Sequence, residues 1–333
     1  MRKKNVDLST FEGRIKKQGY HQVGLHSAAK ICKYAKDSIL NKGGCYKHKF
    51  YGISSHQCLQ CSPVLQFCNL SCRFCWRIIP ETKTGWLKMP KEFKWDEPEF
   101  IAEGLIKEQK RIMSGFGGNI YADKQKVKEA LNPKHVALSL IGEPTLYPKL
   151  SQLIEEFHKR NMTTFLVTNG TNYKALKNLK VLPTQLYISL VAPDKKTYQY
   201  VTNISESQAK VFWANYIKSL KLLNKLSSKT RTVLRMTLAH NLNDFNLEGY
   251  AKLINIAKPH YVEVKSMVYV GWARNAQRGL KLSDMLTMEE IRRFASDLAD
   301  LTNYIYTDEH ELSRVALLCR DKQAQAQRIL KLS

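Results

Sequence analysis

The feature that most constrains the fold is a regular alternation of apolar, strand-like runs with amphipathic, helix-like segments between residues 62 and 270. The expected strands are 62–67, 135–144, 163–170, 185–193, 232–240 and 261–270, and the expected helices between them are 146–160, 172–179, 207–226 and 246–257. Repeated strand–helix units build a parallel sheet covered by helices. We therefore expect an α/β fold, as a parallel sheet or a partial barrel.

Two segments flank this core. Residues 28–40 have the pattern of a helix, and residues 287–301 have that of another, which Thr287 and Glu290 would begin as a capping box. We therefore divide the chain into an N-terminal extension (1–61), a barrel (62–275) and a C-terminal helical extension (276–333).

Polar motifs follow four of the expected strands. They are the cysteine loop around residues 68–75, "GEPT" (142–145), "TNG" (168–170) and "APD" (192–194). Barrels of parallel strands carry their chemistry at the carboxyl ends of the strands. We therefore expect these motifs to lie together and to form the active site.

The charge balance points to a polyanionic partner. The chain has 53 Lys and Arg against 29 Asp and Glu, a net charge of +24, and residues 1–60 hold 12 basic against 3 acidic side chains. A second basic stretch follows residue 207 and is a candidate nucleic-acid-contacting surface: Lys210, Lys218, Lys221, Lys225, Lys229, Arg231 and Arg235. A lysine-rich but merely solvated surface is the alternative. With no long apolar run or signal-peptide pattern, a cytoplasmic protein without a membrane partner is expected.

Seven of the eight cysteines fall between residues 32 and 75, a density that favours metal binding over disulfides. Cys68, Cys72 and Cys75 have the spacing C-x3-C-x2-C. Three thiolates on a 4Fe–4S cubane leave one iron open for a substrate, whereas four ligands saturate a metal site. A zinc ribbon is the alternative, with Cys58, Cys61, Cys72 and Cys75 as ligands.

The triplet, with Phe74 before its last cysteine, resembles the radical SAM superfamily, and "IGEPT" resembles that family's glycine–glutamate–proline motif. Ile141 stands where the family usually has a further glycine. The resemblance implies a partial (β/α)6 TIM-like barrel of the radical SAM type, whose Cys68, Cys72 and Cys75 hold a 4Fe–4S cluster. It further implies that S-adenosyl-L-methionine is bound by Gly142, Glu143, Pro144, Thr168, Asn169 and Ser189. A Rossmann methyltransferase is excluded because the nearest glycine motif, at 115–120, fails at Ile120.

Residues 24–77, together with "SLIGEPTLYP", "VTNG" and "SMVYVGWARNA", closely resemble the 4-demethylwyosine synthase family. This implies condensation of N1-methylguanosine in tRNA(Phe), next to the anticodon, with pyruvate. It also implies a second 4Fe–4S cluster on Cys32, Cys45 and Cys58, with Cys61 spare, and a Schiff base between Lys47 and pyruvate. From the residues alone, Lys42 or Lys49 would serve as well as Lys47. An external donor of the flavodoxin or ferredoxin type and a monomeric enzyme are expected.

Two other functions stay open at this point. One is a different RNA-modifying radical SAM enzyme, and the other is a non-catalytic, zinc-stabilised RNA-binding protein. Four histidines near the cysteines are expected to be structural or RNA-facing rather than metal ligands: His21, His26, His48 and His56.

Overall fold

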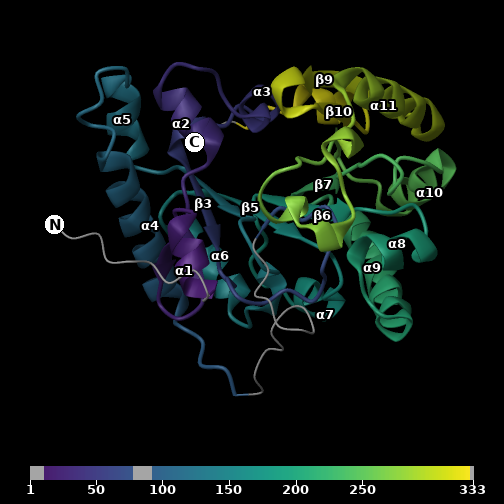
Figure 1. Cartoon of the computed structure of the whole chain (residues 1–333), viewed down its shortest axis with the longest axis horizontal. Helices are drawn as coiled ribbons and strands as arrows, with labels where there is room; N and C mark the ends of the chain where they lie inside the picture. Colours follow the sequence, from purple (N-terminus) through teal and green to yellow (C-terminus); the bar gives the residue numbers. More distant parts are fainter. Residues whose placement is uncertain (1–10, 78–91, 331–333) are drawn as a thin grey trace.

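The structure, a computed structural model, describes residues 11–77 and 92–330 and contains one ten-stranded sheet (Figure 1). The strands are β1 (His21–Val23), β2 (Ser27–Ala29), β3 (Cys58–Ser62), β4 (His135–Leu138), β5 (Thr163–Thr168), β6 (Gln185–Leu190), β7 (Arg231–Met236), β8 (Tyr261–Lys265), β9 (Ile305–His310) and β10 (Val315–Cys319). Strands β3 to β8 pair in parallel and in chain order. These six strands form the expected partial TIM-like barrel.

Antiparallel strands extend the sheet at both edges, and they correct two expectations. The segment expected to be helical from residue 28 begins as β2, because Ala28 and Ala29 pair with β3 and are fully buried. Tertiary pairing overrides the helical preference of alanine there. The C-terminal extension is only partly helical, since β10 pairs with β8 and carries β9 outside it.

The first barrel strand lies earlier in the chain than its apolar pattern indicates. Strand β3 ends at Ser62 and is followed by Pro63, which has no N–H to continue the hydrogen-bond ladder. Residues 63–67 are therefore a loop, and the expected boundary between residues 61 and 62 falls inside β3. Alternation along β3 places Cys58 on one face of the sheet and the fully buried Cys61 on the other.

Helices cover the outer face of the sheet. The twelve described helices are α1 (Phe11–Lys17), α2 (Lys33–Ile39), α3 (Tyr46–Tyr51), α4 (Pro98–Ser114), α5 (Lys124–Ala130), α6 (Leu150–Lys159), α7 (Tyr173–Lys177), α8 (Lys195–Thr202), α9 (Glu206–Leu226), α10 (Leu247–Ala257), α11 (Met288–Thr302) and α12 (Lys322–Ala326). The expected capping box of Thr287 and Glu290 at the start of α11 is confirmed. No described helix has the length and apolar character needed to span a membrane.

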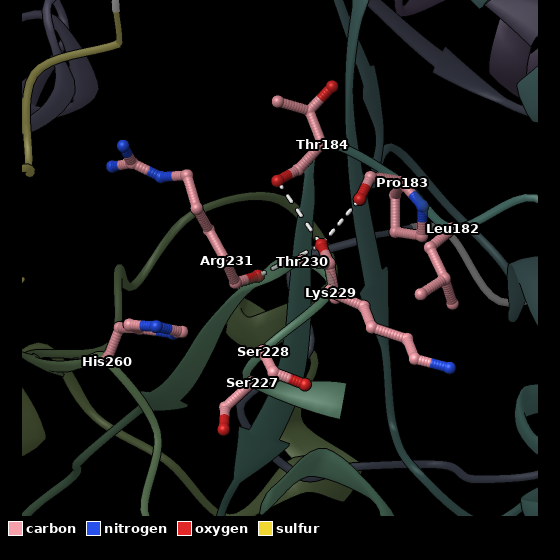
Figure 2. Close-up of a pocket in the computed structure, with 9 residues that line it drawn as sticks. All are labelled: Leu182, Pro183, Thr184, Ser227, Ser228, Lys229, Thr230, Arg231 and His260. Atoms are coloured by element: carbon pink, nitrogen blue, oxygen red, sulfur yellow. Dashed lines mark hydrogen bonds between the residues drawn. The ribbon is translucent and has the colours of Figure 1, made fainter. Parts of the chain in front are cut away.

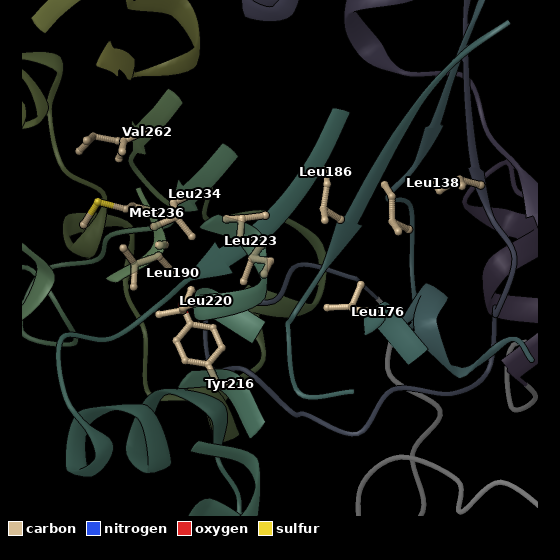
Figure 3. Packing of buried hydrophobic residues seen from close by; sticks show 14 of the residues in the cluster. Leu138, Leu176, Leu186, Leu190, Tyr216, Leu220, Leu223, Leu234, Met236 and Val262 are labelled. Atoms are coloured by element: carbon tan, nitrogen blue, oxygen red, sulfur yellow. The ribbon is translucent and has the colours of Figure 1, made fainter. Parts of the chain in front are cut away.

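The main core lies between the sheet and this helical layer. Leu186, Leu234 and Val262 point outward from neighbouring strands and pack in one cluster with Leu220 and Leu223 of α9 (Figure 3). All five side chains are at most 1% exposed. This packing fixes the order of the strands, and with it the positions of the loops at their carboxyl ends.

A second core fills the inner face of the sheet. The aromatic side chains of α3 pack with residues that point inward from the strands, including Phe165 and Tyr187. The C-terminal segment closes over α3, since the Leu330 amide donates to the Tyr51 carbonyl and Arg328 donates to the Lys49 carbonyl. Helix α3 of the N-terminal extension is thus packed into the barrel, whereas β1 and β2 extend the edge of the sheet.

Candidate active site

The cysteine loop follows β3 and is anchored on two sides. On one side, the amides of Ser71 and Arg73 donate to the carbonyls of Thr202 and Val201 at the end of α8. On the other side, the buried guanidinium of Arg278 donates to the carbonyls of Ser71 (2.6 Å) and Cys72 (3.1 Å). The protein itself therefore holds the loop in place.

Gly142 brings the "GEPT" turn against this loop. Its φ of +73° is left-handed, and a Cβ at this position would overlap the carbonyl oxygen of Val64. The next amide, that of Glu143, donates to the carbonyl of Phe67 (2.9 Å). Only glycine fits this approach, so the turn after β4 is fixed relative to the cysteines.

The Glu143 carboxylate joins the ends of two strands. It is 2% exposed and accepts hydrogen bonds from the amide and hydroxyl of Thr145, the hydroxyl of Thr168 and the amide of Asn169. Burial raises the pKa of Glu143, and these hydrogen bonds act in the opposite direction. The predicted residues Glu143, Thr168 and Asn169 therefore form one hydrogen-bond network, in which the Thr168 hydroxyl donates to the Glu143 carboxylate.

Asn169 extends the network to the cysteine loop. Its side-chain nitrogen donates to Asn69 (2.8 Å) and lies 4.0 Å from the Cys68 sulfur. Ser189 lies on the next strand, where it pairs across the sheet with Arg235 of β7. Cys68, Glu143 and Asn169 thus lie together, whereas the alternation of side chains along β6 places Ser189 on the same face of the sheet as Tyr187.

Tyr198 of α8 is a site residue that the sequence pattern did not reveal. Its ring is 1% exposed, and its hydroxyl has no hydrogen-bond partner among the described residues. Burial raises the pKa of Tyr198 strongly, and the nearby charges of Cys72, Cys68 and Glu143 raise it further. A buried donor without a partner costs about 1–3 kcal/mol, so this hydroxyl is positioned for an acceptor that a bound cofactor would supply.

Burial also disfavours the ionised forms of the Cys68 and Cys72 thiols, which a bound metal would stabilise. Burial raises the pKa of Cys72 to about 12 and that of Cys68 well above its ordinary value. Within the described ranges, no group of three His, Cys, Asp or Glu side chains is arranged to hold a single metal ion. Three cysteines in one loop suit a 4Fe–4S cubane, in which each cysteine binds a different iron. Cys61 is buried in the outer core, so the zinc-ribbon ligand set is not formed.

Cys32, Cys45 and Cys58 converge from three separate elements. Cys32 precedes α2, Cys45 caps α3 and Cys58 begins β3. Burial raises the pKa of Cys45 to about 11 and that of Cys58 to about 12. Cys32 adds to both increases as a like charge, while Lys47 opposes them. The three thiols and Lys47 are therefore within electrostatic range of one another, and the Lys47 amide donates to the Cys45 sulfur at 3.5 Å.

Lys47 is enclosed by the inner face of the barrel. It is 9% exposed, and its ammonium nitrogen lies 5.2 Å from the ring centroid of Phe165 and 4.9 Å from that of Tyr187. Lys42 is exposed, and Lys49 is an exposed residue paired with Asp308 at 2.9 Å. Burial therefore distinguishes Lys47 from Lys42 and Lys49, a choice that the sequence alone does not allow.

Further cations lie beside this interior site. Arg235 pairs with the buried Glu263 (3.1 Å), and burial together with the charge of Arg235 lowers the pKa of Lys265 to about 8. Arg231 donates to carbonyls of the C-terminal segment instead of facing solvent. Arg231 and Arg235 are therefore not part of an RNA-facing helix surface, whereas the five lysines of that stretch are exposed.

Two charged residues lie near members of the two cysteine groups. Arg77, two residues after Cys75, donates to the hydroxyl of Tyr20, and burial raises the pKa of this tyrosine. Burial lowers the pKa of Lys30 to about 8, and the charge of Arg77 lowers it further, whereas Cys32 raises it. Lys30 is therefore within electrostatic range of both Arg77 and Cys32.

The four histidines all have structural partners. His26 bonds to the Pro63 carbonyl (2.6 Å), and His48 bonds to the Ile53 carbonyl (2.9 Å). His21 and His56 contact Glu108 and Glu129, respectively. The structure thus gives each of them a role in local packing.

The surface pockets lie at the other end of the barrel. A pocket of about 440 Å³ is lined by residues that precede β6, β7 and β8, among them Thr184, Thr230 and His260 (Figure 2). Another, of about 540 Å³, is lined by Asn132, Pro133 and Met162, which precede β4 and β5. Neither pocket includes a predicted site residue, because the candidate site lies within the barrel and at its carboxyl end.

Comparison with protein families agrees with this geometry. The family described as "Radical SAM superfamily" matches residues 62–254, and the family described as "Wyosine base formation" matches residues 256–320. The first match implies S-adenosyl-L-methionine and a 4Fe–4S cluster as cofactors, together with a source of electrons.

Three curated relatives are named S-adenosyl-L-methionine-dependent tRNA 4-demethylwyosine synthase. The Pyrococcus abyssi protein is 45% identical, with coverage of 92% of this chain and 87% of the relative. The Methanocaldococcus jannaschii protein is 41% identical, with coverage of 91% and 94%. The Arabidopsis thaliana protein is 35% identical and matches 96% of this chain, which corresponds to 48% of that longer relative.

Two solved structures are similar over almost the whole chain. "Structure of TYW1 with a lysine-pyruvate adduct bound" has a TM-score of 0.81 and 39% identity, and covers 93% of this chain and 95% of that one. "Crystal structure of archaeal TYW1" has a TM-score of 0.75 and 35% identity, with coverage of 96% and 98%. The expected superfamily and fold are thereby confirmed, and the chain belongs to the S-adenosyl-L-methionine-dependent tRNA 4-demethylwyosine synthase family.

Proposed function

We propose that this protein converts N1-methylguanosine, next to the anticodon of tRNA(Phe), into the tricyclic base 4-demethylwyosine with pyruvate as the second substrate. The observation that carries this proposal is the enclosed Lys47 beside Cys32, Cys45 and Cys58 in a barrel whose mouth carries a three-cysteine loop. A lysine adduct of pyruvate in a similar solved structure supports the same role for an enclosed lysine here.

The carboxyl-end site would generate the radical. Cys68, Cys72 and Cys75 would hold the first 4Fe–4S cluster, and the cluster and S-adenosyl-L-methionine together supply a 5'-deoxyadenosyl radical that removes hydrogen from the N1-methyl group. S-adenosyl-L-methionine would be bound by Gly142, Glu143, Pro144, Thr168, Asn169 and Ser189. The fixed "GEPT" turn supports this assignment, because Gly142 holds its backbone against the cysteine loop.

The interior site would hold pyruvate. The neutral amine of Lys47 attacks the ketone carbon, and the carbonyl oxygen leaves as water when the Schiff base forms. Cys32, Cys45 and Cys58 would hold a second 4Fe–4S cluster that supports the bound keto acid. After the methyl-derived carbon adds to the ketone carbon of pyruvate, the bond to the carboxylate carbon would break, and that carbon would leave as a one-carbon fragment together with the unpaired electron. The exocyclic amine of the guanine would displace the Lys47 amine, so that two pyruvate carbons stay in the tricyclic base and the enzyme would act as a carbon–carbon lyase.

The proposal extends to partners and organisation. Residues 1–61 would supply the interior site, residues 62–275 the radical site, and residues 276–333 the closing segment. An external donor of the flavodoxin or ferredoxin type would supply the electron. We place the enzyme in the cytoplasm as a monomer, since its cysteines are free thiols and its proposed substrate is tRNA.

Labelled pyruvate provides the direct test. The anaerobically reconstituted protein is incubated with methylated tRNA, S-adenosyl-L-methionine, dithionite and carbon-labelled pyruvate, and the nucleosides are then analysed by mass spectrometry. Label in a tricyclic nucleoside supports the proposal. Formation of 5'-deoxyadenosine without label in the RNA would instead assign the protein to another radical SAM reaction.

A further inference from the structure

Three arginine–aromatic pairs surround the cysteine loop at the surface of the molecule. In each pair a guanidinium carbon lies over an aromatic ring, at 4.2 Å, 3.4 Å and 6.0 Å from the ring centroid. The pairs, which we call the arginine–aromatic rim, are Arg73 with Tyr200, Arg77 with Trp76, and Arg274 with Tyr269. All three come from segments at the carboxyl ends of the barrel strands, where the candidate radical site lies.

The rim is continuous with the cysteine loop. The Arg73 side chain donates to the carbonyl of Tyr200 at 2.9 Å, which connects the loop to the end of α8. On the opposite side, the amide of Trp272 donates to the carbonyl of Trp76 at 3.0 Å. Gly271, with a φ of +56°, makes this second approach possible, because a Cβ there would overlap the same carbonyl oxygen. The backbone segments that carry Tyr200 and Trp76 are therefore anchored next to the cysteine loop.

The exposure of the rings indicates a role outside the core. Tyr200 is 55% exposed and Trp76 is 37% exposed. Other strongly exposed rings, such as Tyr121 (77%) and Phe100 (53%), have no cation over them in the described part of the chain. Exposed rings with arginine partners are thus concentrated at the entrance to the candidate site.

We propose that the arginine–aromatic rim binds the anticodon loop by stacking its unpaired bases on Tyr200 and Trp76, while the exposed Arg274 and the half-buried Arg73 contact the flanking phosphates. This inference rests on the proposed function, since it names how the tRNA of that reaction is held. Proteins recognise single-stranded RNA loops mainly through splayed bases that stack on aromatic rings or guanidinium planes. The net charge of +24 complements the phosphate backbone.

Stacking at the rim also explains how the target base would be presented. A guanosine inside a stacked loop cannot reach a site within the barrel, so its neighbours must be separated from it. Rings on both sides of the cysteine loop would hold those neighbours, and the methylated guanosine would point inward. The rim is therefore a positioning surface, distinct from the groups that act on the base.

Binding of an RNA stem-loop to the full-length protein tests this inference. The probe is a fluorescent anticodon stem-loop that carries N1-methylguanosine, and affinity is measured by anisotropy. Tyr200→Ala is expected to weaken binding about tenfold, because one base–ring stack is lost, whereas Tyr200→Phe keeps wild-type affinity. Tyr121→Ala is the matched control, since it removes a more exposed tyrosine from the connection between α4 and α5 and is expected to have no effect.

A second probe separates stacking from a structural effect. An abasic residue beside the methylguanosine should weaken wild-type binding by the same factor as Tyr200→Ala, and the two changes together should be no worse than either alone. Additive losses, or wild-type affinity of Tyr200→Ala, would overturn the inference. If Tyr200→Ala does not fold, Arg274→Gln with a series of salt concentrations replaces it, and an unchanged salt dependence would count against the rim. Failure of the wild-type protein to bind the stem-loop would instead contradict the proposed function.

Discussion

The two groups of three cysteines differ in how the chain assembles them. Cys68, Cys72 and Cys75 lie within eight residues, on a loop anchored by Arg278 and by the end of α8. Cys32, Cys45 and Cys58 come from three elements that meet only when the N-terminal extension packs into the barrel. The first group is a local motif, whereas the second is a product of the tertiary fold.

Their surroundings differ in charge as well. Around the loop, the described charges are mixed: the Glu143 carboxylate and the Arg278 guanidinium both lie near it, together with the neutral side chains of Asn169 and Tyr198. Around the interior group they are mainly cations, namely Lys47 and Arg235, with Lys265 nearby. A cationic, buried surrounding favours an anionic ligand, and a keto acid carries the required carboxylate. The difference supports separate tasks for the two sites.

The largest expected effect comes from removing one cysteine of each group. Cys72→Ala should abolish cleavage of S-adenosyl-L-methionine, because the radical site loses its cluster. Cys45→Ala should still form 5'-deoxyadenosine but should give no tricyclic base. Chromatography of both products measures the split. Equal loss of both products in both variants would mean that the two groups do not have separate tasks.

The next effect concerns the lysine of the interior site. Borohydride reduction in the presence of pyruvate should attach a three-carbon adduct to the wild-type protein, detected by mass spectrometry of the peptide with residue 47. Lys47→Ala should lose the adduct completely, because the other buried amine near Cys45, that of Lys265, donates to the Ser313 carbonyl. Lys49→Ala is the control, since Lys49 is exposed and paired with Asp308. An adduct that persists in Lys47→Ala would assign the Schiff base elsewhere, with Lys265 as the first candidate.

A smaller effect is expected at the radical site from Tyr198→Phe. Without iron, the variant should be more stable than the wild type by about 1–3 kcal/mol, because a buried hydroxyl without a partner is removed. In the reconstituted protein the hydroxyl would donate to the cofactor, so Tyr198→Phe should no longer be more stable than the wild type. The reduction potential of the first cluster should also differ between the variant and the wild type. Calorimetry and a potentiometric titration measure the two quantities. The same gain in stability with and without iron would show that the hydroxyl has no cofactor contact.

The smallest effect is a pH dependence at the edge of the interior site. His135 pairs across the sheet with Cys58, and burial together with nearby cations lowers its pKa from 6.5 to about 4. Between these values the unfolded chain binds a proton that the folded protein does not, so stability should fall as the pH decreases from 6.5 towards 4. His135→Gln should reduce this loss in thermal denaturation at pH 7 and pH 5. An identical loss in the variant would assign the acid sensitivity to other groups.

Much of the fold follows from sequence periodicity, but two kinds of segment do not. The strands and helices of the barrel could be predicted because each buries one face, as Leu186 and Leu234 illustrate against α9. Strand β3 was misplaced because the apolar run after Pro63 resembles a strand but fills a loop beside Gly142. Strand β10 was missed because all its side chains are buried, which gives no alternation to detect.

The residues of the candidate active site could also be predicted only in part from the sequence. The cysteine loop and "GEPT" are local motifs, so their spacing predicts them. The choice of Lys47 over Lys42 and Lys49 needs the fold, because only packing against Phe165 and Tyr187 encloses it. Tyr198 and Arg278 carry no motif, since their importance comes from contacts with a loop more than 100 residues away in the sequence.

Iron analysis tests the central claim that the two cysteine groups hold separate clusters. After anaerobic reconstitution, the wild-type protein should contain about eight irons and eight acid-labile sulfides per chain, as two 4Fe–4S clusters require. A variant with Cys32, Cys45 and Cys58 all replaced by alanine should retain about four of each. A wild-type protein with only about four irons, or a triple variant with the wild-type content, would contradict the account.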